Sequence, residues 1–373
     1  MKISPELNLL IKASLDNASE LPFQVEARSI DWQKLGRQAK WNQVRPLAFD
    51  FLSQNPDNLA ADDVLAQLRD FSVGQAVTNM AFSSISVHLN QQLAQQGVRA
   101  FLMKGALWAW LLYEKPGLRE FGDIDFFVAK EQLQGGLNVF EQNGFEPDSY
   151  RKYLLRSDKA ASAYLNTDYQ LPLTPVREHA LRSLEIQWNC SYPRYQFNFS
   201  WKELCSEMVG HQIMGKTVNV PVLENQLIMM LVHHVGIEQW DKLKYMADFV
   251  RLLKQYSATL DWAYISRIAR HKGFFNLLLE SLGAAQMLTG IQYVRLVDPT
   301  GNAEYPSAGF MQDIVSHWED ERDTLKTKTF RILAYNLKYR DNWKVKLRIL
   351  SGHLGYLVHW RLIWHKWIWH KNR

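Results

Sequence analysis

Two aspartates, Asp123 and Asp125, stand one residue apart in a short apolar segment, 123–128, that is typical of a β-strand. Side chains alternate between the two faces of a strand, so both carboxylates project on one side while Ile124 points to the core. Two carboxylates held this close repel each other unless a cation lies between them. Mg²⁺ is the expected cation, because it prefers oxygen ligands and is commonly bound by one or two carboxylates together with substrate phosphates.

A third carboxylate is available in the segment 184–188, which alternates between apolar and polar residues. That alternation places Glu185 and Gln187 on one face of a second strand. If the two strands are neighbours, Asp123, Asp125 and Glu185 have the layout of a two-metal phosphoryl-transfer site. These three residues are therefore the predicted metal ligands.

Short strands and helices alternate around these acidic residues. The segment 98–103 is β-like, Lys104 and Gly105 form a tight turn, and 106–113 is an apolar helix. After the Asp-x-Asp strand we expect a helix over 131–143, and then strands over 163–171 and 182–188. Strands interleaved with helices indicate a small sheet domain.

Helical patterns flank this sheet on both sides. Residues 1–97 are predicted to be mostly helical. Beyond residue 200, one β-like stretch over 217–222 is followed by four amphipathic helices, predicted over 224–238, 241–255, 262–271 and 274–288. The sequence thus predicts an α+β fold with a small mixed sheet. Its expected divisions are a helical region 1–97, the sheet core 98–190, a helical domain 191–337 and a tail 338–373.

The charge of the chain is concentrated at its C-terminal end. The 373 residues are 47% hydrophobic and carry a net charge of +5. Residues 338–373 hold nine Lys or Arg against one acid, Asp341, so this tail contributes +8 and the rest of the chain −3. The basic charge therefore predicts a basic tail and not a nucleic-acid-coating surface throughout.

Cysteine use and hydropathy favour a cytoplasmic protein. Cys190 and Cys205 form no CxxC pair, so neither a structural zinc site nor a disulfide framework is expected. The first residues lack the apolar segment of a signal peptide. The longest apolar stretch, 105–113, is far shorter than the roughly 20 residues of a membrane span. We therefore expect no integral membrane segment.

The segment from 101 to 125 resembles a known family. The residues 101–106, Tyr113, 118–119 and 122–125 are similar to those of the uncharacterised bacterial nucleotidyltransferase family 5 proteins, within the superfamily that has the DNA polymerase β-like palm. The resemblance extends over roughly residues 30–255. Its further parts are a helical leader at 31–35, the strand 184–188, and the helical segments 224–234 and 244–248.

The resemblance implies a reaction and a role for each site residue. In that superfamily an Asp pair binds the metals that hold an NTP, a glycine turn contacts the phosphates, and a third carboxylate activates the acceptor hydroxyl. It thus implies that Asp123 and Asp125 hold two Mg²⁺ ions, that Glu185 is the third acidic residue, and that Gly105 belongs to the phosphate turn. The implied activity transfers an NMP group from an NTP to a small molecule, a protein or a tRNA.

Two departures from the family pattern affect the phosphate turn. The chain has Lys104, Gly105 and Ala106 where Gly-Ser or Gly-Gly is common, and Gly122 where many relatives have Ser. We expect the cations of Lys104 and Arg119 to supply the missing phosphate contacts. The alternative is an inactive relative that binds nucleotide or a partner, in which Arg119 neutralises the acidic residues.

Three further signals have a structural explanation. Residues 210–217 match the P-loop pattern, but a strand follows the lysine, so a chance match in a hairpin turn is favoured. His233 and His234 point about 100° apart on a helix and are unsuited to ligate one metal together. Lys244 and Asp248 are predicted to form an intrahelical ion pair, with a role in the site as the alternative.

The tail carries an aromatic stripe beside basic residues. Trp360, Trp364 and Trp367 recur at helical spacing, next to Arg361, Lys366 and Lys371. Packing in a core or an interface is the favoured interpretation of such a stripe. The alternative is that residues 338–373 contact an anionic membrane surface or RNA.

Overall fold

A five-stranded mixed sheet carries the predicted acidic residues. The computed structural model describes residues 3–15, 30–54, 62–179, 181, 183–300, 305–320 and 328–371. The strand order is β1 (Ala100–Met103), β2 (Ile124–Val128), β5 (Leu184–Gln187), β4 (Gln170–Pro175) and β3 (Phe145–Pro147). Only β2 and β5 pair in parallel; the other pairs are antiparallel. The chain has the expected α+β fold with a small mixed sheet.

The central strand β2 is buried along its whole length. Phe126 packs against Phe140 of α6 (Leu133–Gln142), with ring centroids 5.4 Å apart. On the other face of β2, Phe127 stacks on Phe101 at 5.1 Å. Strands that take part in parallel pairing are usually covered on both faces. Here that burial fixes the position of Asp125, which lies within β2.

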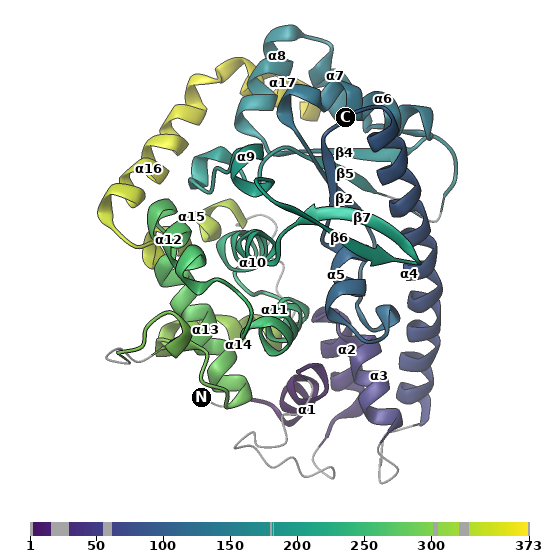
Figure 1. Cartoon of the computed structure of the whole chain (residues 1–373), viewed down its shortest axis with the longest axis vertical. Helices are drawn as coiled ribbons and strands as arrows, with labels where there is room; N and C mark the ends of the chain where they lie inside the picture. The colour runs from purple at the N-terminus through teal and green to yellow at the C-terminus, as the bar shows by residue number, and fades with distance from the viewer. Residues whose placement is uncertain are drawn as a thin grey trace.

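Four helices form the N-terminal region: α1 (Pro5–Ser14), α2 (Trp32–Trp41), α3 (Arg45–Ser53) and α4 (Asp62–Gln95). The long helix α4 runs along one side of the sheet (Figure 1). Its buried Asn79 donates hydrogen bonds to the carbonyls of Pro116 and Arg119, both at 2.8 Å. The helix therefore holds the loop that leads into β2.

The four amphipathic helices predicted beyond residue 220 are confirmed. The elements of this part are α9 (Trp201–Leu204), β6 (Met208–Ile213), β7 (Lys216–Pro221), α10 (Leu223–Leu231), a π-helix η5 (Val232–Ile237), α11 (Leu243–Tyr256), α12 (Trp262–Lys272), α13 (Phe275–Thr289), α14 (Ala308–Glu319), α15 (Lys328–Tyr339), α16 (Trp343–Val358) and α17 (Trp360–Lys371). The P-loop match spans the β6–β7 hairpin, so the chance match is confirmed.

One predicted strand is wrong. The strand expected over 163–171 is instead the end of helix α8 (Asp158–Thr167) followed by β4. Ala160, Ala163 and Tyr164 are buried at helical spacing. This helical period outweighs the preference of the local side chains for a β-strand, so the segment forms a helix. Helix α7 (Ser149–Leu155) and strand β3 were not predicted. The strand expected over 182–188 is β5, and residue 182 lies outside the described residues.

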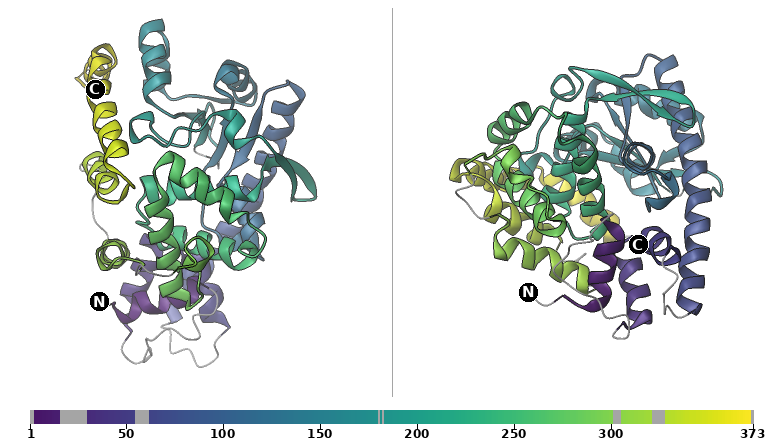
Figure 2. Two further views of the ribbon diagram at one scale, coloured as in Figure 1. Left: turned by 60° about the vertical axis from the view of Figure 1, so that its left-hand side comes forward. Right: turned by 60° about the horizontal axis from the view of Figure 1, so that its bottom comes forward.

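The last two helices return to the sheet region. Figure 2 shows α16 and α17 along one edge of the molecule, and α17 packs on α7 and α8. The buried apolar residues form one continuous core from Leu7 to Leu362. None of the described helices combines the length and the apolar character needed to cross a membrane.

Arg340 joins the α15–α16 connection to the rest of the chain. It is fully buried at 0% exposure, and its guanidinium donates to the carbonyls of Gly273, Lys272 and Tyr195 at 2.6, 2.7 and 2.7 Å and of Gln196 at 3.3 Å. This single side chain thus serves four backbone acceptors, of which the Gly273 carbonyl also accepts from the backbone N–H of Asp341. The arginine therefore fixes α16 against the end of α12.

Replacing Arg340 by Met removes the donor from the carbonyls of Tyr195, Gln196 and Lys272, and leaves that of Gly273 with the backbone N–H of Asp341 alone. We expect Arg340→Met to lower the free energy of unfolding by about 3 kcal/mol, measured by urea unfolding. The matched control is Arg348→Met at an exposed position of α16, where a change within about 0.5 kcal/mol is expected. Equal effects of the two variants would contradict this account of Arg340.

Candidate functional site

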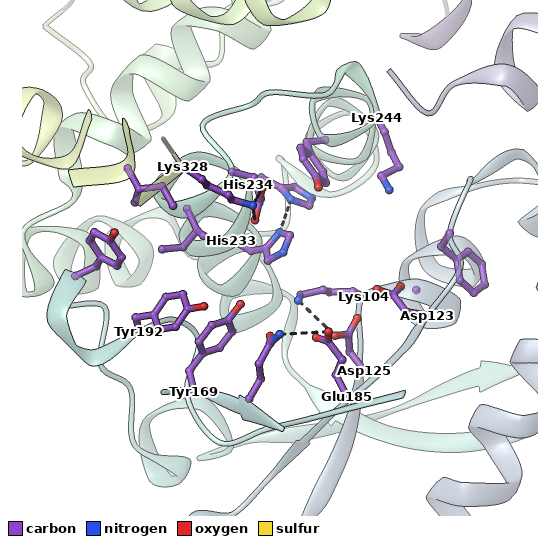
Figure 3. A pocket seen from close by; sticks show the side chains of 18 of the residues that line it. Lys104, Asp123, Asp125, Tyr169, Glu185, Tyr192, His233, His234, Lys244 and Lys328 are labelled. Atoms are coloured by element: carbon purple, nitrogen blue, oxygen red, sulfur yellow. Dashed lines mark hydrogen bonds and ion pairs between the residues drawn. The ribbon is translucent and has the colours of Figure 1, made fainter. Parts of the chain in front are cut away.

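A pocket of about 480 Å³ lies between the sheet and the C-terminal helices. Its lining includes all six residues singled out from the sequence: Lys104, Gly105, Arg119, Asp123, Asp125 and Glu185. They come from the β1–α5 turn, the loop before β2, and strands β2 and β5; α5 spans Gly105–Leu112. The opposite wall comes from η5, α11 and α15 (Figure 3). The volume is in the range of small-ligand sites.

The acidic residues meet across the parallel strand pair. Asp125 and Glu185 are directly opposed in the β2–β5 register, so their side chains share one face of the sheet. The amide nitrogen of Gln187 donates to Asp125 Oδ1 at 2.7 Å, and that of Gln170 donates to Glu185 Oε1 at 3.2 Å. Asp123 precedes β2 and is partly exposed in the same pocket.

Lys104 faces this acidic cluster. Its Nζ lies 3.6 Å from Asp125 Oδ1, and its side chain is only 12% exposed. Burial raises the pKa of Asp125 well above its usual value. The positive charge of Lys104 lowers this pKa in part, whereas the nearby carboxylates of Asp123 and Glu185 raise it further. Burial likewise raises the pKa of Glu185. Although burial alone would lower it, the nearby carboxylates raise the pKa of Lys104.

The turn between β1 and α5 has an unusual backbone. Lys104 has φ 45° and Gly105 has φ 27°. A Cβ atom on Gly105 would lie 3.1 Å from the carbonyl oxygen of Asp123. Glycine is therefore required here both for its positive φ and for the close approach of the two segments. This turn brings Lys104 and Asp123 to the same side of the pocket.

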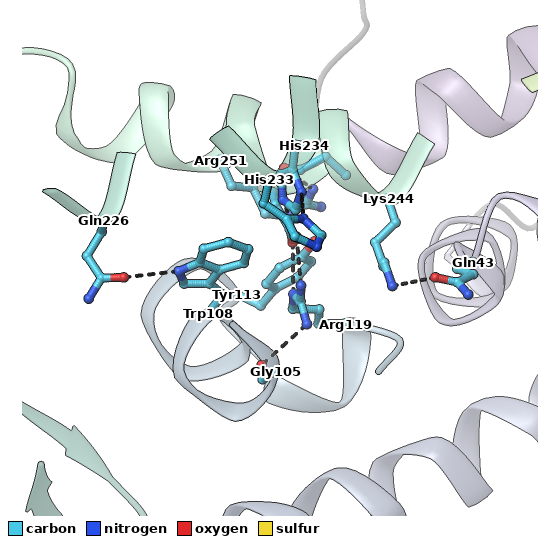
Figure 4. A network of polar contacts seen from close by, with 12 residues as sticks. Gln43, Gly105, Trp108, Tyr113, Arg119, Gln226, His233, His234, Lys244 and Arg251 are labelled. Atoms are coloured by element: carbon cyan, nitrogen blue, oxygen red, sulfur yellow. Dashed lines mark hydrogen bonds and ion pairs between the residues drawn. The ribbon is translucent and has the colours of Figure 1, made fainter. Parts of the chain in front are cut away.

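Arg119 forms a buried ion pair with Asp248 of α11. Its Nε and its Nη2 donate to the two carboxylate oxygens at 3.0 and 2.9 Å, and its Nη1 lies 3.4 Å from the carbonyl of Gly105 (Figure 4). Tyr113 donates to the same carboxylate at 2.7 Å. Although burial would raise it, the charge of Arg119 holds the pKa of Asp248 well below its usual range. Arg119 thus pairs with Asp248 and not with the acidic cluster.

Lys244 lies on the same helix as Asp248 but has another partner. Its ammonium donates to the side-chain oxygen of Gln43, at the end of α2. The predicted ion pair between Lys244 and Asp248 is therefore absent among the described residues. Lys244 lines the pocket, as the alternative prediction had it.

The two adjacent histidines both line the pocket, because they lie in the wide turns of the π-helix η5. Their Nδ1 atoms are 2.9 Å apart. The His234 ring stacks on Tyr245, with centroids 4.3 Å apart. Burial lowers the pKa of His234 to about 4. Burial, together with the charge of Lys104, also lowers the pKa of His233 well below its usual value. Both rings are neutral at pH 7 and add no charge to the pocket.

Several pocket residues were not singled out from the sequence. Tyr169, Tyr192 and Tyr245 present aromatic rings, and Lys328 at the start of α15 pairs with Glu238. The tyrosines come from three separate parts of the chain, and no local pattern marks them. Only the tertiary arrangement brings them together.

A second cavity of about 420 Å³ adjoins the first and shares Tyr192, Arg194 and Thr329 with it. Its remaining wall comes from α7, α8, α16 and α17, including Lys366 of the tail. The Arg194 guanidinium lies 4.1 Å from the Tyr192 ring centroid and, within the described ranges, forms no ion pair with a carboxylate. Lys366 donates to the hydroxyl of Tyr356 at 2.8 Å. The second cavity is therefore lined by aromatic and basic side chains, together with the carboxylate of Asp168.

The acidic cluster has the chemistry of a Mg²⁺ site. Asp123, Asp125 and Glu185 supply hard oxygen ligands, and the buried Oε1 atom of Gln187 beside them has no hydrogen-bond partner among the described residues. Within the part of the chain that the structure describes, no three His, Cys, Asp or Glu side chains are grouped closely enough to hold one ion. Mg²⁺ commonly takes one or two carboxylates and completes its coordination with water and substrate phosphates. The carboxylates of this cluster fit such a coordination.

Comparison with known proteins identifies one family. The model of a family described as "uncharacterised nucleotidyltransferase" matches residues 28–290, well over half of the chain. The matched region includes the sheet, the β1–α5 turn, η5 and α11. The resemblance found in the sequence is thereby confirmed. Searches of the curated proteins and of the solved structures find no match.

The ion pair between Arg119 and Asp248 makes a testable contribution to stability. Asp248→Asn leaves the arginine buried without its counter-charge, so we expect the free energy of unfolding to fall by about 3–5 kcal/mol in urea unfolding. The matched control is Asp70→Asn, which breaks the exposed ion pair with Arg69 and is expected to change stability by less than about 0.5 kcal/mol.

The same pair gives a defined dependence on pH. The pKa of Asp248 is lowered in the folded state, so its contribution is complete above the unfolded pKa of about 4 and is lost as the pH falls through the folded value. The stability difference between the wild type and Asp248→Asn should therefore be constant from about pH 8 to pH 5 and narrow only below about pH 4. A difference that narrows already above pH 5 would contradict the lowered pKa.

Proposed function

Because the chain belongs to the uncharacterised nucleotidyltransferase family, we propose that it transfers a nucleoside monophosphate from an NTP to an acceptor hydroxyl, with Mg²⁺ bound at the acidic cluster. The observation that carries this proposal is the register of β2 and β5. It places Asp125 beside Glu185 at the base of a pocket that also holds Lys104, Gly105 and Asp123. Cation-binding and phosphate-binding groups thus meet in one cavity.

Each site residue has a proposed role. Asp123, Asp125 and Glu185 are assigned to two Mg²⁺ ions, with one or two of these carboxylates for each ion; when bound, the ions offset the negative charge of the triphosphate. Lys104 and the Gly105 turn contact the phosphates. The nitrogens of Arg119 are already bonded to Asp248 and to the Gly105 carbonyl, so Arg119 is a positioning residue for that turn.

The proposed reaction is an in-line displacement at the α-phosphorus. The acceptor oxygen forms a bond to that phosphorus while the bond to the bridging oxygen of the β-phosphate breaks, and pyrophosphate leaves. The proton of the acceptor hydroxyl passes to the carboxylate of Glu185. Lys104 stabilises the charge on the phosphate oxygens, so catalysis depends chiefly on positioning and electrostatics.

The aromatic residues and the second cavity offer places for the rest of the substrates. Tyr169, Tyr192 and Tyr245 provide ring faces on which a base stacks. The second cavity opens from the same space at Tyr192 and Arg194. We assign the acceptor to this second cavity, because it adjoins the pocket that holds the cluster without being part of it. We place the activity in the cytoplasm, where the free thiols of Cys190 and Cys205 stay reduced.

An inactive, nucleotide-binding relative is the second candidate. The observation that favours it is the position of Lys104, whose ammonium already neutralises part of the acidic cluster at 3.6 Å from Asp125. The two candidates differ in turnover and not in nucleotide binding. Formation of labelled product from an α-labelled NTP supports the transferase, whereas binding without any product under all acceptor conditions supports the inactive relative.

Thermal melting with nucleotides tests the site directly. With an NTP at about 100 times its dissociation constant, we expect Mg²⁺ and NTP together to raise the melting temperature of the wild type by about 4 °C or more, since a ligand that binds only the folded state stabilises it. Asp125→Asn removes a metal ligand, so its Mg²⁺-dependent rise should be lost.

The matched control is Asp313→Asn, which changes an acid whose partner Lys338 lies on the surface and should keep the full shift. No shift with any of the four common NTPs, with or without Mg²⁺, would refute nucleotide binding at this pocket. An equal shift in wild type and Asp125→Asn would place the nucleotide elsewhere.

A further inference from the structure

The C-terminal helices α16 and α17 expose an unusual number of apolar side chains. Of the eighteen large hydrophobic residues that are exposed in the described part of the chain, nine lie on or between these two helices. They are Trp343, Leu347, Leu350, Leu354, Leu357, Val358, Trp360, Trp364 and Trp367. We call this set the outer apolar face. Exposed apolar surfaces of this kind mark interaction sites.

The residues of α16 in this set share one side of the helix. Trp343, Leu347, Leu350 and Leu354 follow one another at alternating intervals of four and three residues, which keeps them on one face. Val345 and Ile349, on the opposite side, are buried against the protein at 7% and 0% exposure. Helix α16 is therefore apolar both toward the core and away from it.

Helix α17 has the same arrangement. Trp360, Trp364 and Trp367 are 50–62% exposed, whereas Leu362 is fully buried. On the buried side, Trp369 packs against Tyr150 and Tyr153 of α7, with ring centroids 5.6 and 5.4 Å apart. The helix is thus anchored by one side. Core packing of the tryptophan stripe is wrong, and its packing in an interface with a partner stays a prediction. The stripe faces outward.

Basic residues flank the outer apolar face, and no acid accompanies them. The sequence contains no Asp or Glu after Asp341. Besides Lys366, which lines the second cavity, the described part of this segment contains five cations: Lys344, Lys346, Arg348, Arg361 and Lys371. The partner of such a surface must therefore be apolar in its interior and anionic at its boundary.

We propose that the outer apolar face binds an anionic lipid bilayer, with α16 and α17 lying in the membrane interface. Helices that bind in this way combine an apolar face rich in Trp and Leu with flanking Lys and Arg. Tryptophan is the residue that prefers the boundary between hydrocarbon and headgroups. Negative headgroups attract the flanking cations. The outer apolar face meets all three requirements.

Two other partners fit the same surface less well. Nucleic acid is bound through aromatic stacking and positive charge, but five of the nine exposed residues are Leu or Val, which cannot stack on bases. A second copy of the chain would bring two faces of equal positive charge together without acids to compensate them. An anionic bilayer provides an apolar interior for the aliphatic residues and negative headgroups for the basic residues.

The position of these helices gives membrane binding a consequence for the site. α16 supplies His353 and Tyr356, and α17 supplies Lys366, to the wall of the second cavity. A bilayer on the outer apolar face therefore lies next to that cavity. Membrane binding itself does not depend on nucleotide transfer.

Flotation of the full-length chain with lipid vesicles tests the proposal. We expect it to float with vesicles of phosphatidylcholine containing about 30% phosphatidylglycerol at low salt, and to float at least about tenfold less with pure phosphatidylcholine or at about 0.5 M NaCl. The triple variant Trp360→Ser, Trp364→Ser, Trp367→Ser should lose at least about tenfold in partitioning. The three positions are exposed, so we expect its melting temperature to stay unchanged.

The matched control replaces three exposed apolar residues of α4, which are Val73, Val77 and Met80, by Ser and should float like the wild type. The charge variant Arg361→Gln, Lys371→Gln should weaken flotation with the anionic vesicles alone. The proposal is overturned by wild-type flotation of the tryptophan variant, by equal loss in the α4 control, or by no flotation at all. A stripe-dependent shift with single-stranded RNA, or a stripe-dependent dimer, in the absence of vesicle binding overturns it in favour of those partners.

Discussion

The buried ion pair between Arg119 and Asp248 determines how the two halves of the pocket meet. Arg119 lies in the loop before β2, and α4 holds its carbonyl through Asn79. Asp248 lies in α11, on the opposite wall. Charges buried to this extent need a partner with good geometry, so the pair ties the loop before β2 to helix α11. The contact of Arg119 with the Gly105 carbonyl extends that constraint to the turn beside Asp123.

Nearby positive charge balances Asp248 and the acidic cluster to different degrees. Although burial would raise it, the pKa of Asp248 is lowered by the charge of its bidentate partner Arg119 and by its contact with His234. Asp123, Asp125 and Glu185 have Lys104 as the nearby cation, and the pKa values of Asp125 and Glu185 are raised. Three carboxylates beside one ammonium leave a deficit of positive charge that a divalent cation removes. The difference between these groups is why we propose the cluster, and not Asp248, as the Mg²⁺ site.

Local sequence patterns predicted the cluster because strand alternation and the β1–α5 turn are local properties. They placed Asp125 and Glu185 on strands and Gly105 in a turn, and the register of β2 and β5 brings the acids together. The pairing of Arg119 with Asp248 spans 129 residues, and no local period indicates it. The tyrosines of the pocket are missed for the same reason. The strand predicted over 163–171 failed where the buried positions of α8 follow a helical period.

The tail shows why the spacing of residues on a helix leaves its orientation open. Trp360, Trp364 and Trp367 have the same period whether their face packs inward or points outward. Other residues of the same helix determine the orientation. Leu362 and Trp369 occupy the inner side, so the three tryptophans of the stripe are exposed. The inner side also carries Lys366 into the second cavity, so the two sides of one helix serve a surface and a pocket. Any molecule that covers the outer side therefore limits the directions from which a substrate reaches the inner one.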